Sequence, residues 1–279
     1  EVFQQSNGRI RVNLHFGGSL GGEKEVAEDV AAGVVDFCIT SSVGYAGPMA
    51  LPKLGIFDVP FLFRDITHAR SVIDGPIGKA ALVSLRSVGL EGLAWGENGL
   101  RQITTRDKPV RKPSDLLGMK LRVPPSETAL AAFKGFGANP SAMPANDVYA
   151  ALADGSMDAQ ENDANRIKSA EFYQVQKYLC LTNHIYSTTM LLASERSFDA
   201  LSAEDRQIVR QAALSFTPRA RQINDSTSAS DITELAQLGM TVVKDVDRAA
   251  FVEANAKTQP IYEKMFGADA ILAIQNFKG

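Results

Sequence analysis

Apolar and polar residues alternate along the first hundred positions in patterns that are typical of strands and helices in turn. The segment 10–16 reads Ile-Arg-Val-Asn-Leu-His-Phe, and this strict alternation predicts a half-buried strand. A glycine-rich turn follows at 17–22, and the segment 23–32 then has helical spacing with acidic residues in its first turn. The same reasoning predicts further elements, namely a strand at 35–40, helices at 68–73 and 77–88, and a strand at 90–95.

The alternation continues to the C-terminus. It predicts strands at 121–123, 177–181, 189–193 and 241–243, and helices at 113–118, 126–136, 146–155 and from about 249. Asn146 is expected to cap one of these helices. One helical pattern extends from Ser202 to about Leu238 and is interrupted only at Thr217-Pro218. Since this is about three times the usual helix length, the helix needs two lobes to lie against. We therefore expect an α/β protein of two lobes joined by several chain crossings.

Composition places the chain among ordinary folded proteins, with 45% hydrophobic and 22% charged residues. The 29 lysines and arginines nearly balance the 32 acidic residues, so no nucleic acid is expected as a partner. No apolar run is long enough to span a membrane. The two cysteines, Cys38 and Cys180, lie inside apolar runs, which favours buried, unpaired thiols over a disulfide. The chain begins at Glu1 without a signal-peptide pattern, so we expect a processed or truncated product.

Sequence features of enzymes are few. The three histidines, His15, His68 and His184, stand apart from one another, without the spacing of metal ligands. Cys-x-x-Cys and the phosphate-binding glycine patterns are absent, so neither a metal nor a cofactor is expected. Gly17-Gly18-Ser19-Leu20-Gly21 matches the Gly-x-Ser-x-Gly nucleophile elbow, but the segment before it is half polar, whereas an elbow follows a doubly buried strand. A glycine-rich turn is favoured, and a serine hydrolase that uses Ser19 is the alternative.

Polar side chains next to short strands favour a binding site. Asn98 and Arg101 follow one predicted strand, and Arg122 lies inside another short apolar strand. Burying an arginine is costly unless an acid or an anion meets it. Arg122 therefore binds an anionic ligand, pairs with a carboxylate of the protein, or reaches the surface. Asn162 ends a polar run, and its amide offers both a donor and an acceptor.

In their order along the chain, these segments resemble the solute-binding proteins of tripartite ATP-independent periplasmic (TRAP) transporters, of the type that binds C4-dicarboxylates and sialate. The resemblance covers essentially the whole chain, and its most specific block runs from Asn98-Gly99-Leu100-Arg101-Gln102 to Lys120-Leu121-Arg122-Val123-Pro124. The other matching stretches are Ser6-Asn7-Gly8-Arg9-Ile10, Leu20-Gly21, Val59-Pro60-Phe61-Leu62-Phe63, Asp147–Leu152, Gln160-Glu161-Asn162 and Phe172–Leu179.

The resemblance implies a periplasmic-binding-protein-like fold, in which two hinged α/β lobes enclose a ligand cleft and a long helix spans both lobes. We expect one lobe from residues 1–98 and about 187–226, and the other from 99–186 and about 227–279. Family members carry a first strand and most of a helix before Ser-Asn-Gly-Arg, where this chain has only residues 1–5, so we expect the first lobe to lack that strand. The resemblance also implies a periplasmic protein without enzymatic activity that delivers its ligand to the membrane permease subunits of a transporter. We expect it to be a monomer, and a sensory or orphan binding module of the same fold is a further alternative.

By the same resemblance, Arg122 holds the ligand carboxylate in a bidentate fork, as the planar guanidinium group allows. Arg101 corresponds to a second ligand-facing arginine, and Asn162 to an asparagine that closes on the ligand opposite Arg122. The full set of expected ligand-binding residues adds Ser41, Ser42, Asn98, Asn146 and Asn165 to these three.

Departures from the family pattern bear on the identity of the ligand. Ser41 and Gly44 stand where sialate binders have an acidic residue and an arginine, and Ala145 replaces an aromatic of their pocket, so a sialate is not expected. Ser41 and Ser42 suit the recognition of hydroxyl groups, which favours a hydroxylated monocarboxylate such as a sugar acid. A C4-dicarboxylate is the alternative, because Arg101 could bind a second carboxylate.

Overall fold

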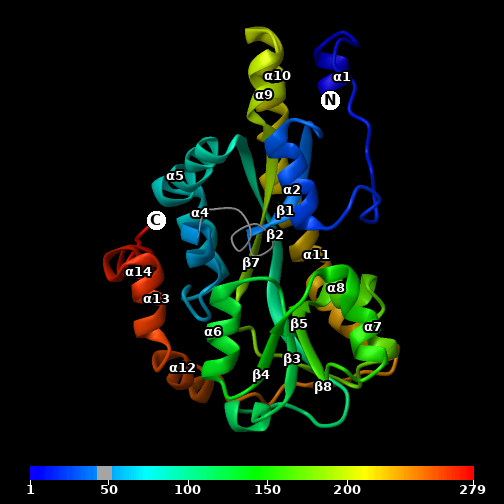
Figure 1. Ribbon diagram of the computed structural model, residues 1–279, viewed down its shortest axis with the longest axis vertical. Coiled ribbons are helices and arrows are strands. Elements are labelled where there is room, and N and C mark those ends of the chain that lie inside the picture. Colours follow the sequence, from blue (N-terminus) through cyan, green and yellow to red (C-terminus); the bar gives the residue numbers. More distant parts are fainter. Residues whose placement is uncertain (43–51) are drawn as a thin grey trace.

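A computed structural model describes residues 1–42 and 52–279 and has two α/β lobes, one above the other in Figure 1. Within these ranges, the strands form one sheet in the order β1-β7-β2-β5-β3-β4, with β6 paired to β2 and β8 paired to β6. The strands are β1 (Phe37–Ser41), β2 (Leu90–Thr105), β3 (Lys120–Val123), β4 (Asn139–Ala142), β5 (Ala159–Asp163), β6 (Tyr178–Cys180), β7 (Tyr186–Ser194) and β8 (Thr241–Val243). The expected two-lobed α/β fold is thereby confirmed.

Strand β2 belongs to both lobes, because its two ends pair with different strands. Residues 90–100 pair with β7 and residues 101–105 pair with β5, in both cases antiparallel. The register shifts between Glu97 and Gly99, so a bulge marks the point where the strand leaves one lobe for the other. Gly99 has a φ of +100°, and a side-chain carbon there would overlap the amide of Asn224. Only glycine fits this position.

The upper lobe packs its helices on the β1-β7-β2 part of the sheet. Its helices are α1 (Val2–Gln5), α2 (Glu23–Ala32), α4 (Ile66–Asp74), α5 (Pro76–Ser84), α9 (Glu195–Ala200) and α10 (Ala203–Ala213), with 3-10 turns η1 (Pro52–Asp58) and η2 (Leu85–Val88). Val72, Trp95 and Met190 lie in its buried apolar core. Tyr262 and Ile271 join this core from the C-terminal helices α13 (Gln259–Phe266) and α14 (Ala268–Gln275). The lobe boundaries expected from the sequence stay a prediction.

The lower lobe surrounds the strands β3 to β6 and β8. Its helices are α6 (Glu127–Gly135), α7 (Val148–Ala153), α8 (Ala164–Ser169) and α12 (Arg248–Ala256), with 3-10 turns η3 (Pro113–Leu116), η4 (Ala145–Asp147) and η5 (Phe172–Gln174). Leu121, Phe133 and Phe251 are fully buried in its core. Because Leu121 faces this core, the next residue of β3, Arg122, points to the opposite face of the sheet.

Side-chain caps account for some of the predicted helix starts. The Asp65 carboxylate accepts the His68 amide at 2.7 Å, and the Ser126 hydroxyl accepts an amide of α6 at 3.3 Å. The predicted cap at Asn146 is wrong. This residue lies in η4, and α7 begins after Asp147, whose side chain makes no capping bond.

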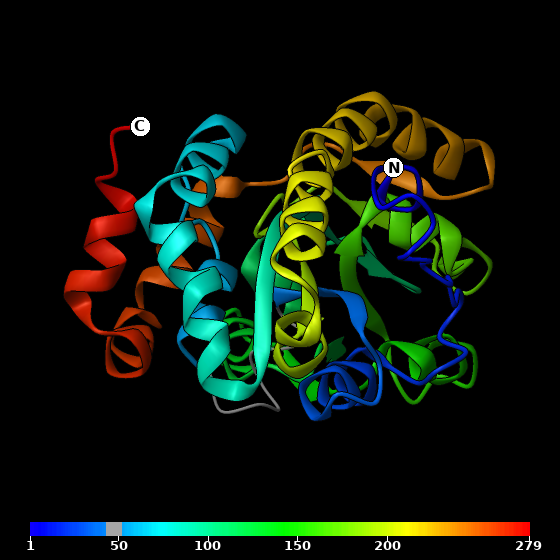
Figure 2. The same cartoon turned by 90° about the horizontal axis from the view of Figure 1, so that it is seen from above.

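The predicted helical stretch 202–238 forms two helices, α10 and α11 (Phe216–Gln237), which are separated at 214–215. Pro218 does not break the pattern, because it lies in the first turn of α11, where its missing N–H would have no partner in the helix. Figure 2 shows α11 leaving α10 and passing over the lower lobe. It packs against β2 and α8, so it touches both lobes as expected.

The predicted strand at 10–16 is wrong, because this segment has no regular secondary structure. Val12, Leu14 and Phe16 are 50%, 69% and 77% exposed. A strand needs a neighbour for its backbone hydrogen bonds, and no strand within the described ranges pairs with this segment.

The two thiols, Cys38 and Cys180, are buried and unpaired as predicted. Among the helices of residues 1–42 and 52–279, none combines the length and the apolar character that crossing a membrane requires.

Candidate functional site

Arg122 is a buried cation without an acid partner. It lies in β3 between apolar neighbours and is 3% exposed. Its Nε and Nη2 groups donate to the carbonyl oxygen of Met143 at 2.9 and 2.7 Å. No carboxylate of the described residues forms an ion pair with it. Of the three possibilities for Arg122, pairing with a carboxylate of the protein is therefore excluded within the described residues.

Arg122 keeps its positive charge, and no bonded carboxylate of the described residues neutralises that charge. Burial lowers the pKa of Arg122 to about 10, and the charge of Arg101 acts in the same direction, while Glu161 and Glu23 oppose them. The guanidinium group stays protonated at neutral pH. A buried charge without a partner is costly, and an anionic ligand would relieve this cost.

Asn162 lies on the same face of the sheet as Arg122. Strands β3 and β5 are parallel, and Arg122 is opposite Gln160, so Asn162 follows two residues further on with its side chain on the same side. The side-chain oxygen of Asn162 accepts the Asp163 amide at 3.2 Å. Its NH2 group has no partner within the described residues and remains available as a donor. The structure thus places Arg122 and Asn162 on one face of neighbouring strands, and their shared role in ligand binding stays a prediction.

Arg101 is engaged by an acid of the protein. Its Nε and Nη2 groups bond the two carboxylate oxygens of Glu161 at 2.5 and 2.8 Å, and both side chains are buried. Burial acts to raise the pKa of Glu161, but the charge of Arg101 and the hydrogen bonds from His184 and Arg101 outweigh it, so this pKa is lowered. Since burial lowers the pKa of His184, its ring is neutral at pH 7 and donates from Nε2 to Glu161 at 3.0 Å. The role of Arg101 in ligand binding stays a prediction, and its charge is neutralised without a ligand.

Ser41 and Ser42 both bond acids of the upper lobe. The backbone N–H and the hydroxyl of Ser41 donate to Glu23 at 3.2 and 2.7 Å. Ser42 is fully buried, and its hydroxyl donates to Asp58 at 2.9 Å and accepts from Thr188 at 3.1 Å. The ligand-binding roles of Ser41 and Ser42 stay a prediction. Gly44 lies outside the described residues.

The three remaining asparagines lie in different surroundings. Asn98 is half-buried at the bulge of β2, and Asn146 is exposed beside the turn at Gly18. Asn165 is exposed on α8 and donates to Asp231 of α11 at 3.4 Å. Within the described ranges, no hydrogen bond joins any of the three to Arg122, and their ligand-binding role stays a prediction.

Glu23 is not among the ligand-binding residues expected from the sequence. It is the first residue of α2, and an acid at a helix start is commonplace because it favours the helix dipole, so its position alone did not single it out. The structure places its carboxylate on the Ser41 hydroxyl and within the electrostatic reach of Arg122.

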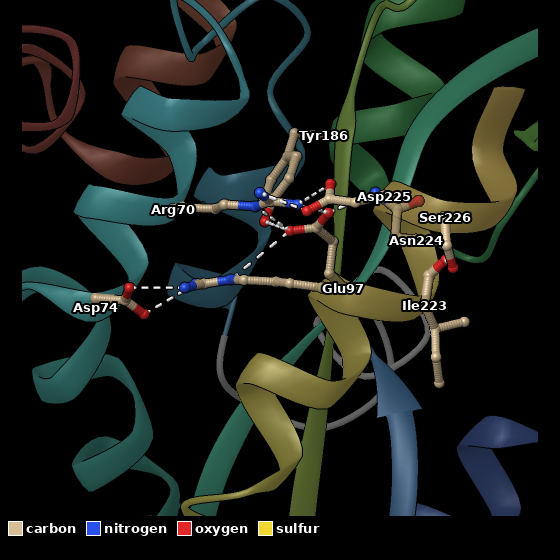
Figure 3. Close-up of polar contacts among 9 residues, drawn as sticks. Arg70, Asp74, Glu97, Tyr186, Ile223, Asn224, Asp225 and Ser226 are labelled. Atoms are coloured by element: carbon tan, nitrogen blue, oxygen red, sulfur yellow. Dashed lines mark hydrogen bonds and ion pairs between the residues drawn. The ribbon is translucent and has the colours of Figure 1, made fainter.

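Glu97 is a buried acid, like Glu161, and it links α4 and α11 to the bulge of β2 (Figure 3). Arg70 of α4 donates to its two oxygens at 2.7 and 2.8 Å, while Tyr186 of β7 and Asn224 of α11 each donate at 2.5 Å. Arg70 also pairs with Asp225 of α11 at 2.6 Å. This network anchors the first half of α11 to the upper lobe.

The second half of α11 is anchored to the lower lobe. Lys168 of α8 forms ion pairs with Asp231 and with Glu234, the latter at 2.8 Å. Helix α11 is therefore bonded to both lobes.

Catalytic and metal chemistry find little support in the described residues. Ser19 lies in an exposed turn, and no histidine or acid is bonded to its hydroxyl within these ranges. No group of three or more histidine, cysteine or acidic side chains in the described part of the chain could hold a metal ion.

The chain is similar to bacterial binding proteins along almost its whole length. The family model described as bacterial extracellular solute-binding protein, family 7 (DctP), matches residues 1–269. A crystal structure of a TRAP periplasmic solute-binding protein from Polaromonas sp. JS666, bound to D-erythronate, is 39% identical, covers 100% of this chain and 91% of that one, and has a TM-score of 0.96.

Two curated relatives differ in the ligand that their names give. The 2,3-diketo-L-gulonate-binding periplasmic protein YiaO of Escherichia coli K12 is 35% identical over 97% of this chain and 83% of its own length. The C4-dicarboxylate-binding periplasmic protein DctP of Rhodobacter capsulatus is 28% identical over 97% of this chain and 81% of its own length.

Proposed function

The chain belongs to family 7 of the bacterial extracellular solute-binding proteins, the DctP family, and from this premise we propose that it captures a sugar acid for a TRAP transporter. It is a solute-binding protein and not an enzyme, so the alternative of a hydrolase that uses Ser19 is wrong. Members of the family are periplasmic proteins that bind small carboxylates. A periplasmic location, a monomeric state and delivery to membrane permease subunits are part of the proposal for this chain.

Arg122 is the observation that carries the proposal. A guanidinium group has five N–H donors, and the Nε and Nη2 bonds to Met143 use two of them. The remaining three include both N–H groups of Nη1 and one of Nη2, which is the pair of nitrogens that an end-on carboxylate fork needs. The NH2 group of Asn162, on the same face of the sheet, would donate to the same ligand.

Closure of the two lobes would complete the site. Arg122 and Asn162 belong to the lower lobe, whereas Glu23 and Ser41 belong to the upper lobe. A ligand that touches both walls favours the closed form by the contacts that exist only there. Closure also excludes water from the carboxylate–Arg122 pair and strengthens it.

Two observations favour a sugar acid over a C4-dicarboxylate. The erythronate-bound structure and the diketogulonate-binding relative are 39% and 35% identical to this chain, compared with 28% for the C4-dicarboxylate-binding relative. The second positive charge that a dicarboxylate would need, Arg101, is neutralised by Glu161. Sugar acids offer one carboxylate and several hydroxyl groups.

Isothermal titration calorimetry with a panel of sugar acids and C4-dicarboxylates tests the proposal. We expect binding of hydroxylated monocarboxylates, and Arg122→Ala should weaken it by two to three decades or more, since breaking a buried charge pair costs roughly 3–5 kcal/mol. Arg111→Ala removes an exposed arginine from the same lobe and should leave affinity unchanged. An Arg122→Ala affinity within a few-fold of wild type would contradict the proposal.

A further inference from the structure

A cavity of about 450 Å³ is lined by residues of both lobes. Most of the upper-lobe segment 59–67 contributes to it, and Arg248 of α12 contributes from the lower lobe. Leu100, Asn183, His184 and Tyr186 complete the lining, at the crossings that β2 and the link from β6 to β7 make between the lobes. The volume is within the range of small-molecule sites, about 300–1,000 Å³.

This cavity is separate from the site at Arg122. His184 lines the cavity and donates from Nε2 to Glu161 at 3.0 Å. Because side chains alternate along a strand, Glu161 points to the opposite face of β5 from Asn162, which shares the face of Arg122. A molecule bound in the cavity would therefore not use the donors of Arg122.

Arg248 brings open hydrogen-bond donors to the cavity. Its guanidinium carbon lies 5.0 Å from the centroid of the Phe61 ring, and its side chain forms no hydrogen bond or ion pair within the described residues. Since the ring covers only one face of the guanidinium plane, the N–H groups at the edge can bond a carboxylate. The NH2 group of Asn183 is also open, because its amide oxygen accepts Gln102 and no described residue accepts from its nitrogen.

The charge of the lining favours an anion. Two arginines, Arg64 and Arg248, stand against one acid, Asp65, so the lining carries a net charge of 2 − 1 = +1 with the His184 ring neutral. The Arg64 guanidinium donates to two backbone carbonyl oxygens near the C-terminus, and these do not neutralise its charge. The Asp65 carboxylate is already engaged as the cap of α4, where it accepts an amide at 2.7 Å.

Two residues of the lining have a left-handed backbone. Phe61 has a φ of +57° and Asn183 a φ of +45°. This conformation is unfavourable for an aromatic residue, and strained residues cluster at ligand sites. The Phe61 amide donates to the carbonyl oxygen of His184 at 2.9 Å, so the bond that fixes the strained residue joins two parts of the lining. The strained backbone thereby holds the Phe61 ring against Arg248.

We propose that this cavity is a second ligand site, which binds a small aromatic monocarboxylate. The carboxylate bonds the edge of the Arg248 guanidinium and the Asn183 NH2 group. The aromatic ring of the ligand packs against the buried side chains of Leu62, Phe63 and Tyr186. Sugar acids suit this cavity poorly, because its apolar surface leaves their hydroxyl groups without partners. The proposal goes beyond sugar-acid capture and does not depend on it.

Phenylacetate serves as the probe, and saturation-transfer NMR on the full chain measures its binding. We expect a dissociation constant on the order of 1 mM or lower. Phenylacetamide has the same shape without the charge and should bind at least tenfold more weakly, and Arg248→Ala should weaken phenylacetate binding as much, because each removes a charge-assisted pair. Arg111→Ala removes an exposed arginine outside the cavity and should keep the wild-type affinity. Thr67→Trp fills the cavity from an exposed position of the lining and should abolish binding.

The variant Arg122→Ala distinguishes the two sites. Phenylacetate should bind it as tightly as wild type, because the cavity lies on the other face of the sheet. Loss of binding in Arg122→Ala would assign the probe to the sugar-acid site and overturn the inference. Equal binding to wild type, Arg248→Ala and Thr67→Trp would overturn it as well, and so would an absence of binding to wild type at about ten times the expected dissociation constant.

Discussion

Replacing Asp58 by asparagine should change how the stability of the protein depends on pH. Asp58 ends η1 and is fully buried. One of its oxygens accepts the Ser42 hydroxyl at 2.9 Å, and the other has no partner in the described part of the structure. Burial raises the pKa of Asp58 from 3.8 to about 7, against the opposing effects of the Ser42 hydrogen bond and the charge of Arg101.

The sign and size of the effect follow from this shift. An acid whose pKa is higher in the folded state than in the unfolded state contributes stability below the unfolded value, near 3.8, and this contribution is lost as the pH rises to about 7. A shift of about three units corresponds to about 4 kcal/mol. Asp58→Asn lacks this titration, so its stability relative to wild type should rise by about 4 kcal/mol between about pH 4 and pH 7.5.

Urea unfolding of both proteins across this pH range measures the difference. The cost of burying the amide is the same at each pH, so the slope isolates the titration of Asp58. Thr40→Val is the control, because it removes a buried hydroxyl without a partner and no titratable group, so its effect should be constant with pH. A difference between Asp58→Asn and wild type that stays constant within about 1 kcal/mol would refute the reasoning.

Three further predictions concern stability and reactivity. Glu161→Gln should lower the free energy of unfolding by roughly 3–5 kcal/mol in urea unfolding, because it leaves the buried Arg101 without its acid, and a loss below about 1 kcal/mol would contradict this. Gly99→Ala should lower the melting temperature by several degrees, because of its positive φ and its contact with α11, and an unchanged melting curve would show that the bulge tolerates a side chain. Burial raises the pKa of Cys38 to about 12 and that of Cys180 to about 11, so neither thiol should react with a disulfide reagent at pH 8 until denaturant is added. Rapid labelling of Cys38 or Cys180 in the native protein would disprove this prediction of unreactive thiols.

Much of the fold was predictable because the periodicity of helices and strands depends only on residues that are close in the sequence. The long helical pattern that predicts a lobe-spanning element corresponds to α10 and α11, and the apolar strand around Arg122 corresponds to β3. Segment 10–16 shows the limit of this reasoning. Its alternation is as regular as that of a strand, but a strand exists only where another backbone completes its hydrogen bonds, and local pattern does not report that partner.

The sequence by itself determined that Arg122 lies in a short apolar strand, β3, because that pattern is local to a few adjacent residues. Only the tertiary structure decided which arginine is neutralised, because the acid that meets Arg101 lies 60 residues away in the chain, and no acid is bonded to Arg122 within the described residues. It also decided that Ser42 is buried and that the Glu23 carboxylate accepts the Ser41 hydroxyl. Periodicity is a property of a few adjacent residues, whereas charge compensation depends on distances between strands and lobes that only packing sets.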